Sequence, residues 1–589
     1  MILQALKEYY DRKAADPESG IAPLGWERKE LPFLLVLDTQ GQLVNIEDTR
    51  TIDGKMKVAH PFVLPQSVKR SSGIAANLLW DNVEYVLGIP CKKPVKVERV
   101  KEAHTAFIQN LTPYAQVPAV AILLKLLGCE QNENDLARFA AFAEMKESNA
   151  FISFKIAGEK HPVFCDRDFK ELYEKSLTES DSNEPLPRCL VTGEQDEVAV
   201  THPSIKGVRG ANTTGGNIVS FNYDSTCSFG KKQGHNATVG VRAAFAYTTA
   251  LNTLLGKNSR QKIHVGDATT VFWSAKNCQL EEFFGGFFDD LETKDDPDAL
   301  TSSVAALLTS VKSGSFVKDD AETKFYVLGL SPNAARISVR FWHVGTVAEM
   351  SGRFAEWFDD LTIAHGDKLK DHLSMYRLLC SIAAQGKAEN TPPNLAGNTM
   401  RAILEGLPLP ETLYHAALQR ERLDHSEGWG FVSNQYARMK IIKACLNRKI
   451  RLQENQKERM LTVSLDNENP NLGYRLGRLF AVLERIQERA NPGINATIRD
   501  KYYGSASAMP ASVFGTLMRL KNHHLSKLEN PGEKINLERL LGEIVNGIPP
   551  VMPAHLNATD QGSFAIGYYH QRQDFFTKKE STAETASNN

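Results

Sequence analysis

Residues 202–242 carry the side chains of this chain that are best suited to bind another molecule. The segment holds seven glycines, four asparagines and five cationic side chains against a single aspartate. Glycine lets a backbone come close to a ligand, and an asparagine amide can donate and accept hydrogen bonds at base edges or phosphate oxygens. The composition therefore favours a loop that faces a nucleic acid. Tight turns that join short strands are the alternative that composition leaves open.

Two other stretches of the chain are basic. Lys69 and Arg70 precede a predicted helix, and the amides at a helix N-terminus favour an anion. Residues 437–459 carry eight cations against two glutamates, mostly on a predicted helix. The whole chain has a formal net charge of −1, so contact with nucleic acid has to come from such local patches. An acidic run at 289–298 is predicted to be a solvated loop.

Catalytic motifs are missing from the sequence. A phosphate-binding P-loop requires Gly-x-x-x-x-Gly-Lys-Ser/Thr, and the nearest string, LNTLLGKNS, lacks the first glycine. No His-Glu-x-x-His or Gly-x-Ser-x-Gly string occurs, and the eight cysteines include no Cys-x-x-Cys pair. The adjacent His523 and His524 would point about 100° apart on a helix, which suits a surface better than a metal site. We therefore expect a protein that is not an enzyme and that needs no cofactor or metal.

Hydrophobic periodicity predicts an α+β fold, with short sheets and helices in the N-terminal region and an all-α helical bundle at the C-terminus. Strands are predicted at 31–38 and 43–48. A helix is predicted with its apolar face running from Ile74 to Leu87, and a hairpin is predicted over 150–165 with its turn at Gly158. Strand signals fade beyond about residue 355.

Three regions are predicted along the chain: an α+β region at 1–355, a helical connecting region at 356–459 and the C-terminal helical bundle at 460–589. Residues after about 577 are expected to be disordered. No apolar run approaches the roughly 20 residues that a membrane helix needs. The N-terminus also lacks the basic-then-apolar order of a secretion signal, so we expect an intracellular location.

Long phrases of the sequence resemble one protein family. They follow one another from the N-terminus and include MILQALKEYYDR, GIAPLGWERKELPFLLVLD, LPQSVKRSSGIAANLLWDNVEYVLG, FGKKQGHNATV and YVLGLSPNAARISVRFW. In these phrases the chain resembles the large subunit of the type I-C CRISPR surveillance complex, Cascade. The likeness is specific because long phrases match rather than a short pattern.

The resemblance implies a non-enzymatic subunit of a cytoplasmic, prokaryotic ribonucleoprotein whose backbone subunits hold a CRISPR RNA. Such a large subunit would inspect target double-stranded DNA for the protospacer-adjacent motif, help to form the R-loop and steer the displaced single strand. A separate helicase-nuclease, recruited with its help, then cuts. In RNA-guided systems base pairing reads the long sequence, while the protein reads the short motif and the backbone.

Under this hypothesis region 1–355 inspects DNA. The residues expected to bind the motif are Asn212, Gly215, Gly216, Asn217 and Asn222. The residues expected to bind phosphates are Lys69, Arg70, Lys206, Arg209, Lys231 and Lys232. The residues expected to bind a strand on the helical bundle are Arg475, Arg478, Arg485, Lys501 and Lys521. The likeness does not fix which asparagine touches a base.

The bundle resembles the small subunit of related complexes. In type I-C systems the small subunit can be made by internal translation of the large-subunit message, and its copies would be further partners. Met460 precedes the bundle and is the expected internal start. Met439 is an alternative start, and an ordinary core methionine is the third interpretation.

Two other functions stay open at this point. A nuclease or RNA-processing enzyme with His202, His235 or His264 as acid or base would cleave naked RNA or DNA. A purely structural scaffold subunit would show no change in DNA affinity after Lys231 and Lys232 are neutralised.

Overall fold

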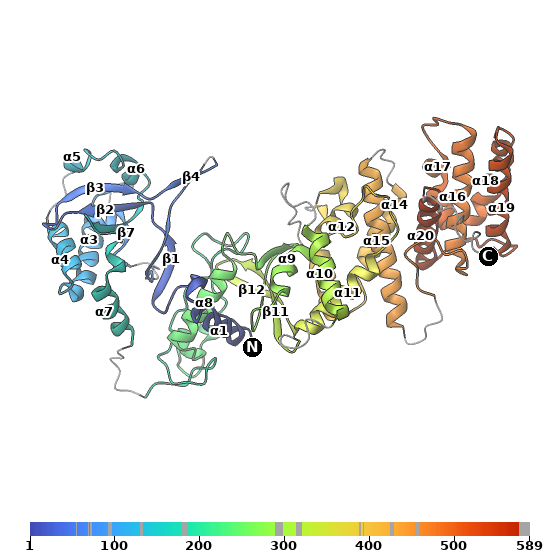
Figure 1. Cartoon of the computed structure of the whole chain (residues 1–589). Helices are drawn as coiled ribbons and strands as arrows, with labels where there is room; N and C mark the ends of the chain where they lie inside the picture. Colours follow the sequence, from blue (N-terminus) through green and yellow to red (C-terminus); the bar gives the residue numbers. More distant parts are fainter. Residues whose placement is uncertain are drawn as a thin grey trace, which may run out of the picture. The chain divides into compact units, whose positions relative to one another are not determined.

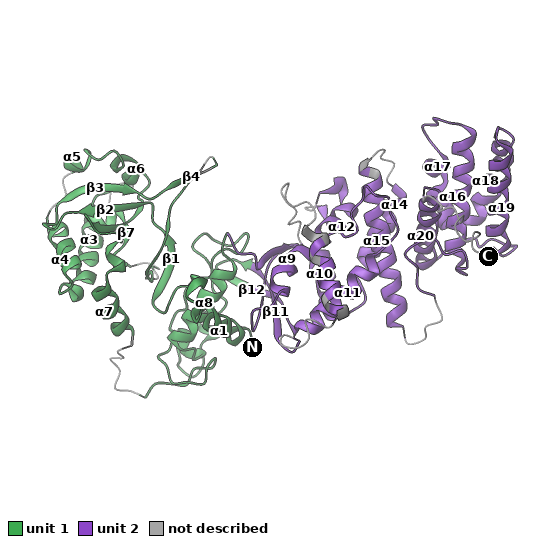
Figure 2. Ribbon diagram, viewed as in Figure 1, with its two compact units in different colours: residues 1–257, 332–337 green, residues 258–331, 338–589 purple. Residues whose placement is uncertain are grey.

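The computed structural model describes residues 1–54, 56–68, 70, 73–91, 97–129, 133–178, 185–288, 299–313, 321–387, 390–392, 394–423, 429–453 and 459–576. The chain divides into two compact units (Figures 1 and 2). Unit 1 contains residues 1–257 and 332–337, and unit 2 contains residues 258–331 and 338–589. Lys69, the acidic run at 289–298 and the tail after residue 576 lie outside the described residues.

Unit 1 combines small sheets with helices. Its elements are α1 (Ile2–Ala14), β1 (Trp26–Glu30), β2 (Phe33–Leu37), β3 (Leu43–Asp48), β4 (Thr51–Asp53), β5 (Met56–Val58), β6 (Pro61–Pro65), β7 (Asp81–Asn82), α2 (Val83–Leu87), α3 (Val97–Leu111), α4 (Pro118–Leu127), α5 (Glu133–Leu136), α6 (Phe142–Glu147), β8 (Phe151–Ile156), α7 (Arg167–Thr178) and α8 (Val241–Leu254).

The main sheet of unit 1 has the strand order β3-β2-β8-β7. The β2–β3 hairpin predicted from the sequence is confirmed, with antiparallel pairing and a register shift between Val36 and Leu37. β8 pairs in parallel with β2, which places it inside the sheet. The hairpin predicted over 150–165 forms only in part. The chain turns at Gly158, whose φ is 87°, and pairs with β8 through a single antiparallel bridge between Lys155 and Pro162 rather than through a second strand.

The helix predicted from Ile74 is also wrong for most of its length. Only Val83–Leu87 is helical, and Leu79 has a positive φ of 64°, which no α-helix accommodates. The buried carboxylate of Asp81 stabilises the irregular backbone, because its Oδ2 atom accepts a hydrogen bond from the Asn77 amide at 2.9 Å. The Trp80 indole donates to the carbonyl of Pro65 at 2.8 Å. These side-chain contacts replace helical hydrogen bonds.

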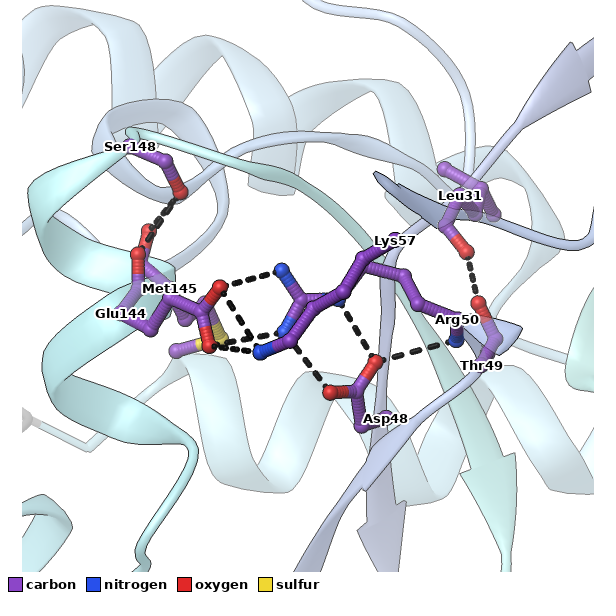
Figure 3. A network of polar contacts seen from close by, with 8 residues as sticks. All are labelled: Leu31, Asp48, Thr49, Arg50, Lys57, Glu144, Met145 and Ser148. Atoms are coloured by element: carbon purple, nitrogen blue, oxygen red, sulfur yellow. Dashed lines mark hydrogen bonds and ion pairs between the residues drawn. The ribbon is translucent and has the colours of Figure 1, made fainter. Parts of the chain in front are cut away.

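A charged network holds the base of the β4–β5 ribbon (Figure 3). The Arg50 guanidinium lies between Asp48 and Glu144, with 2.8 Å from Nε to Asp48 Oδ1 and 2.9 Å from Nη2 to Glu144 Oε2. Lys57 on β5 reaches the same glutamate at 3.1 Å. Hydrogen bonds from Arg50, then from Lys57, lower the pKa of Glu144 to about 2. The network therefore ties the ribbon to α6 across a wide span of sequence.

Unit 2 begins with a four-stranded sheet of order β12-β11-β10-β9 and continues as helices. Its elements are β9 (Lys262–Val265), β10 (Ala268–Ser274), α9 (Leu280–Phe288), α10 (Ala299–Ser313), β11 (Lys324–Asn333), β12 (Arg336–Thr346), α11 (Val347–Leu361), α12 (Met375–Ile382), α13 (Leu395–Glu405), α14 (Glu411–Leu423), α15 (Trp429–Leu452), α16 (Leu472–Ala490), α17 (Ile498–Ala508), α18 (Pro510–Leu525), α19 (Pro531–Asn546) and α20 (Ala558–Asp574). Every element described after Thr346 is helical, which confirms the predicted α+β class.

The predicted boundaries at 355/356 and 459/460 stay predictions. Side chains of α11, α14 and α15 share one hydrophobic core with Tyr474 on α16 and Ile566 on α20. The Tyr414 hydroxyl donates to the carbonyl of Ala558 at 2.7 Å. The helices before residue 460 therefore pack directly on the bundle that follows. Among the described residues, no helix is both long enough and apolar enough to cross a membrane.

Glycines bring α16 and α20 into backbone contact (Figure 1). A Cβ atom on Gly473 would overlap the carbonyl of Asp560, and one on Gly477 would overlap the carbonyl of Phe564. From the other helix, a Cβ atom on Gly567 would overlap the carbonyl of Tyr474. The two helices cross at a distance that only glycine permits, and this contact sets the geometry of the bundle.

We predict that Gly477→Ala lowers the stability of the full chain by at least about 2 kcal/mol, because the new methyl group has to displace backbone. Gly515→Ala on α18 is the matched control, since nothing lies within 4 Å of its Cβ position. This control should gain up to about 1 kcal/mol from helix propensity. Thermal unfolding followed by circular dichroism compares them, and equal midpoints would refute the close-contact account.

Candidate nucleic-acid interface

Residues 185–240, all of which the structure describes, contain isolated bridges and short 3-10 turns but no strand or α-helix. The segment leads into α8, a helix that packs on α1 and buries nine of its fourteen residues. The two ends of the segment are joined, because the Leu190 amide donates to the carbonyl of Thr238 at 2.8 Å, and the Ala199 amide donates to that of Val239 at 2.9 Å. A segment without regular pairing has to satisfy its backbone polar groups by other means. Asparagine side chains supply many of these bonds.

The first loop is residues 205–216. Ile205 and Gly216 close it with two backbone hydrogen bonds of 2.8 and 2.9 Å. Asn252 on α8 holds the base of the loop, because its Oδ1 accepts from the Lys206 amide at 2.8 Å and its Nδ2 donates to the carbonyl of Ser204 at 3.1 Å. Arg209 and Asn212 are exposed near the tip. The loop therefore has a fixed base and an open, basic tip.

Three residues predicted to bind the motif make internal contacts. The Asn217 amide donates to the carbonyls of His202 at 3.0 Å and Pro203 at 3.2 Å. Gly216 is buried in the Ile205 pair, and a Cβ atom on Gly215, whose φ is 88°, would lie 2.6 Å from the carbonyl oxygen of Ile205. Asparagine and glycine at these positions stabilise the turn. This agrees with the alternative interpretation of the composition, in which these residues form tight turns.

Asn212 and Asn222 are placed differently from Asn217, because both are exposed. Their amides lie on the surface, where an external hydrogen-bonding partner can reach them. Base contact remains a prediction for this part of the chain, and these two residues suit it best.

The second loop is residues 222–236, and Asn236 is its clamp. Asn236 Oδ1 accepts from the Ser228 amide at 2.9 Å, and Nδ2 donates to the carbonyls of Lys231 at 3.2 Å and Gln233 at 3.0 Å. Gly234 is buried, and its amide donates to the carbonyl of Val200 at 3.1 Å. Lys231 and Lys232 are both exposed, so this loop also combines a fixed base with a basic surface.

A polar cavity of about 50 Å³ lies beside the second loop, and its lining includes Thr201, His202, Asn217, Ser220, Asn222 and Gln233. It has room for a few water molecules. The buried His202 ring contacts the Tyr247 hydroxyl through Nδ1 at 2.6 Å, and burial raises the pKa of Tyr247. The contact between His202 and Tyr247 joins the segment to α8, so His202 has a structural role.

Lys29 was missed by the sequence reasoning. Its ammonium lies 3.7 Å from the ring centre of Phe151 and 4.2 Å from that of Trp80. Burial lowers the pKa of Lys29 to about 8. The positive charges of Lys206 and Arg70 lower this pKa further, whereas the negative charges of Glu27 and Asp81 raise it. Lys29 therefore lies close enough to Lys206 of the first loop and to Arg70 for their charges to act on it. A single lysine in WERKE gives no sequence signal for this role, because the cluster depends on residues far away in the chain.

Arg70 has a defined internal partner. Its guanidinium forms an ion pair with the buried Asp81 and donates to the carbonyl of Ala75 at 2.6 Å. The long helix predicted behind Arg70 does not exist, and the short α2 begins only at Val83. The prediction of an anion site at a helix N-terminus behind Arg70 is therefore wrong. Arg70 instead binds the Asp81 carboxylate of the same chain.

Half of the cations in the basic segment at 437–459 lie inside the protein. Four of its cations are buried on α15: Arg438, Lys440, Lys443 and Arg448. The Lys440 ammonium donates to the carbonyls of Asp371 at 2.7 Å and Leu361 at 3.3 Å, and burial lowers its pKa to about 7. Lys443 donates to the carbonyl of Asp360 at 3.2 Å. Lys440 and Lys443 thus satisfy the carbonyls of Leu361 and Asp360 at the C-terminal end of α11, where positive charge is favoured.

The predicted strand-binding residues of the bundle fall into two groups, one with internal hydrogen bonds and one nearer the surface. Arg478 is buried and donates to Gln571 at 3.1 Å and to Asn467 at 2.6 Å, so its predicted place on an exposed face is wrong. Arg475 donates to the carbonyl of Asn469 at 2.7 Å and also to that of Gly547. Both arginines brace loops at the ends of helices.

The other three strand-binding candidates keep their charge nearer the surface. Arg485 lies 3.6 Å from Glu488, with its guanidinium near the ring of Phe575. Lys501 is exposed beside the Tyr502 ring, and Lys521 is half-buried on α18. Of the five predicted strand-binding residues, these three remain the best placed to meet a strand.

The model of a protein family described as CRISPR-associated protein (Cas_Csd1) matches residues 6–576. The match covers both compact units and both basic loops. None of the curated proteins compared with the chain matches it.

Asn217 and Asn222 should respond differently to substitution. Asn217→Ala removes two hydrogen bonds to backbone carbonyls and should cost about 1–3 kcal/mol of stability. Asn222→Ala changes an exposed side chain and should stay within about 0.5 kcal/mol of the parent chain. Thermal unfolding and limited proteolysis of the 202–236 segment measure both. An equal response of the two variants would contradict the clamp role of Asn217.

Proposed function

The chain belongs to the CRISPR-associated Cas_Csd1 family, and from this premise we propose that it is the large subunit of a type I-C surveillance complex that recognises the protospacer-adjacent motif in duplex DNA. In this role the subunit is not catalytic. Base pairing with the CRISPR RNA reads the long target sequence, and the protein reads the short motif and the backbone. The CRISPR RNA-containing subunits of the complex are its immediate partners.

The observation that carries the proposal is the pair of clamped loops with exposed cations. The exposed cations are Lys206, Arg209, Lys231 and Lys232. A rigid loop base holds these charges in place, so phosphate binding would not have to order the loop first. Asn212 and Asn222 add amides that can bond to base edges. Phosphate contacts would position the duplex and the amides would test the motif.

The later steps of the proposed role follow from binding of the motif by the two loops. Motif binding would promote R-loop formation, after which the displaced single strand needs a basic path. Arg485, Lys501 and Lys521 on the bundle are the residues we propose for it. The assembled R-loop would then support recruitment of a helicase-nuclease, which supplies the cutting activity.

The C-terminal bundle would also be made as a separate small subunit from Met460. Met460 is partly exposed and lies between α15 and α16, so a product that starts there keeps α16 to α20 whole. Met439 is fully buried within α15, and a start there would begin in the middle of a helix. The positions of the helices therefore favour Met460 over Met439.

Neutralising Lys231 and Lys232 should weaken binding of the assembled complex to every duplex, whatever its flanking motif. Loss of two phosphate contacts should also make the plot of log affinity against log salt shallower by about 2. Asn212→Ala should instead relax the motif preference, by about 1–3 kcal/mol. Lys160→Ala, an exposed lysine beyond the end of β8, is the control and should change neither quantity.

Affinity and salt dependence unchanged in the Lys231/Lys232 double alanine would favour the scaffold alternative. Cleavage of naked RNA or DNA by the purified chain would favour the nuclease alternative.

Changing the Met460 codon to one that cannot start translation should abolish a short product that co-purifies with the complex. The same change at Met439 is the control and should leave that product in place. Mass spectrometry of the purified complex identifies the product by its N-terminus. A short product that persists without the Met460 codon would refute this start.

A further inference from the structure

Phe229 lies at the tip of the second loop and is 99% exposed, more than any other large hydrophobic side chain that the structure describes. Burying a phenylalanine ring is favourable, and an aromatic ring of this size normally finds a place in a core or an interface. The ring therefore contributes almost nothing to the packing of this unit. Its position calls for a role outside the folded chain.

The backbone at Phe229 is held in an unfavourable conformation. Its φ is 52°, in the left-handed region that bulky residues rarely adopt, and the next residue, Gly230, has a φ of 72°. Such a conformation persists only where the surroundings fix it, and such residues gather at ligand-binding sites. Here the Asn236 clamp bonds to the backbone on both sides of the tip, at Ser228 and Lys231. The clamp and the left-handed pair project the ring into solvent.

The surroundings of the ring suit a nucleic acid better than a protein pocket. Lys231 and Lys232 follow it, and the rest of the tip consists of serine, glycine and glutamine. An aromatic anchor in a protein interface usually lies in a hydrophobic core of that interface. Tyr223 on the same loop is 65% exposed, and the Arg336 guanidinium lies 5.3 Å from its ring centre. Exposed aromatic rings among cations are the arrangement that stacks on bases.

We propose that the Phe229 ring stacks on a base that has lost its neighbour where the duplex opens beside the motif. The inference rests on the proposed function and names the residue that would hold the opened base. Apolar side chains that enter a base step offset part of the cost of unstacking, and every base offers a π face. Lys231 and Lys232 would hold the adjacent phosphates while the ring takes the base.

The test measures binding of the assembled complex, with its guide RNA, to a matched duplex that carries the motif. Phe229→Ala should lower the affinity by about 5- to 150-fold, the effect of removing one stacking partner. Phe229→Leu should lose nearly as much, because it keeps an apolar group without a π face, and Phe229→Trp should bind like the parent. The salt dependence should not change, since no charge is removed.

Phe229→Gly gives a readout that a structural residue would not give. Glycine adopts the left-handed conformation freely, so this variant should lose DNA affinity while its Tm stays level or rises. A Tm that falls together with the affinity would show that the ring stabilises the fold, and would overturn the proposal.

Other outcomes distinguish the stacking role of Phe229 from the proposed function of the whole chain. Unchanged affinity of Phe229→Ala, in a complex whose parent form still discriminates motifs, would overturn the stacking role and leave the proposed function standing. Loss of the Phe229→Ala subunit from the purified complex would assign the ring to a protein contact instead. A parent complex that binds every flanking motif equally would refute the proposed function itself.

Discussion

The arrangement of the candidate interface depends on side-chain amides that replace regular backbone pairing. Asn217, Asn236 and Asn252 each bond to backbone groups that a strand or helix would otherwise satisfy. Without these bonds the 202–236 segment would carry unpaired polar groups beside a buried helix, which is unfavourable. The amides therefore fix the loop bases, and the fixed bases determine where the lysines and Phe229 lie. The glycine-rich polar segment is therefore held by specific hydrogen bonds.

Positive charge in this chain has two separate uses. On α15 the buried Arg438, Lys440 and Lys443 donate to backbone carbonyls of Ser381, Leu361 and Asp360. The Asp360 carboxylate forms an ion pair with Arg451. On the two loops of unit 1 the lysines are exposed and lie beside small polar residues. A positive charge that already satisfies a buried carbonyl is not available to a phosphate. The two loops of unit 1 are therefore better candidates for DNA binding than the segment on α15, although that segment carries more basic residues.

Local patterns in the sequence predicted much of the fold. The apolar run in LPFLLVLD and the alternation in LVNIED identified β2 and β3, and the apolar periodicity of the last third identified its helices. The predictions failed where distant residues decide the structure. β8 pairs in parallel with β2, and Asp81 stabilises the chain before α2; neither contact leaves a local pattern. The same reason explains why Lys29 was missed and why asparagines that serve as clamps could not be told from exposed ones.

The measurement that tests the account most directly compares the assembled complex with and without this subunit. Binding to matched duplexes that differ only in the flanking motif is measured at two salt concentrations. The account predicts motif-dependent binding that requires the subunit, and a salt dependence that is steeper when the subunit is present. Equal affinity for every flanking motif, or binding that is unchanged when the subunit is omitted, would contradict it.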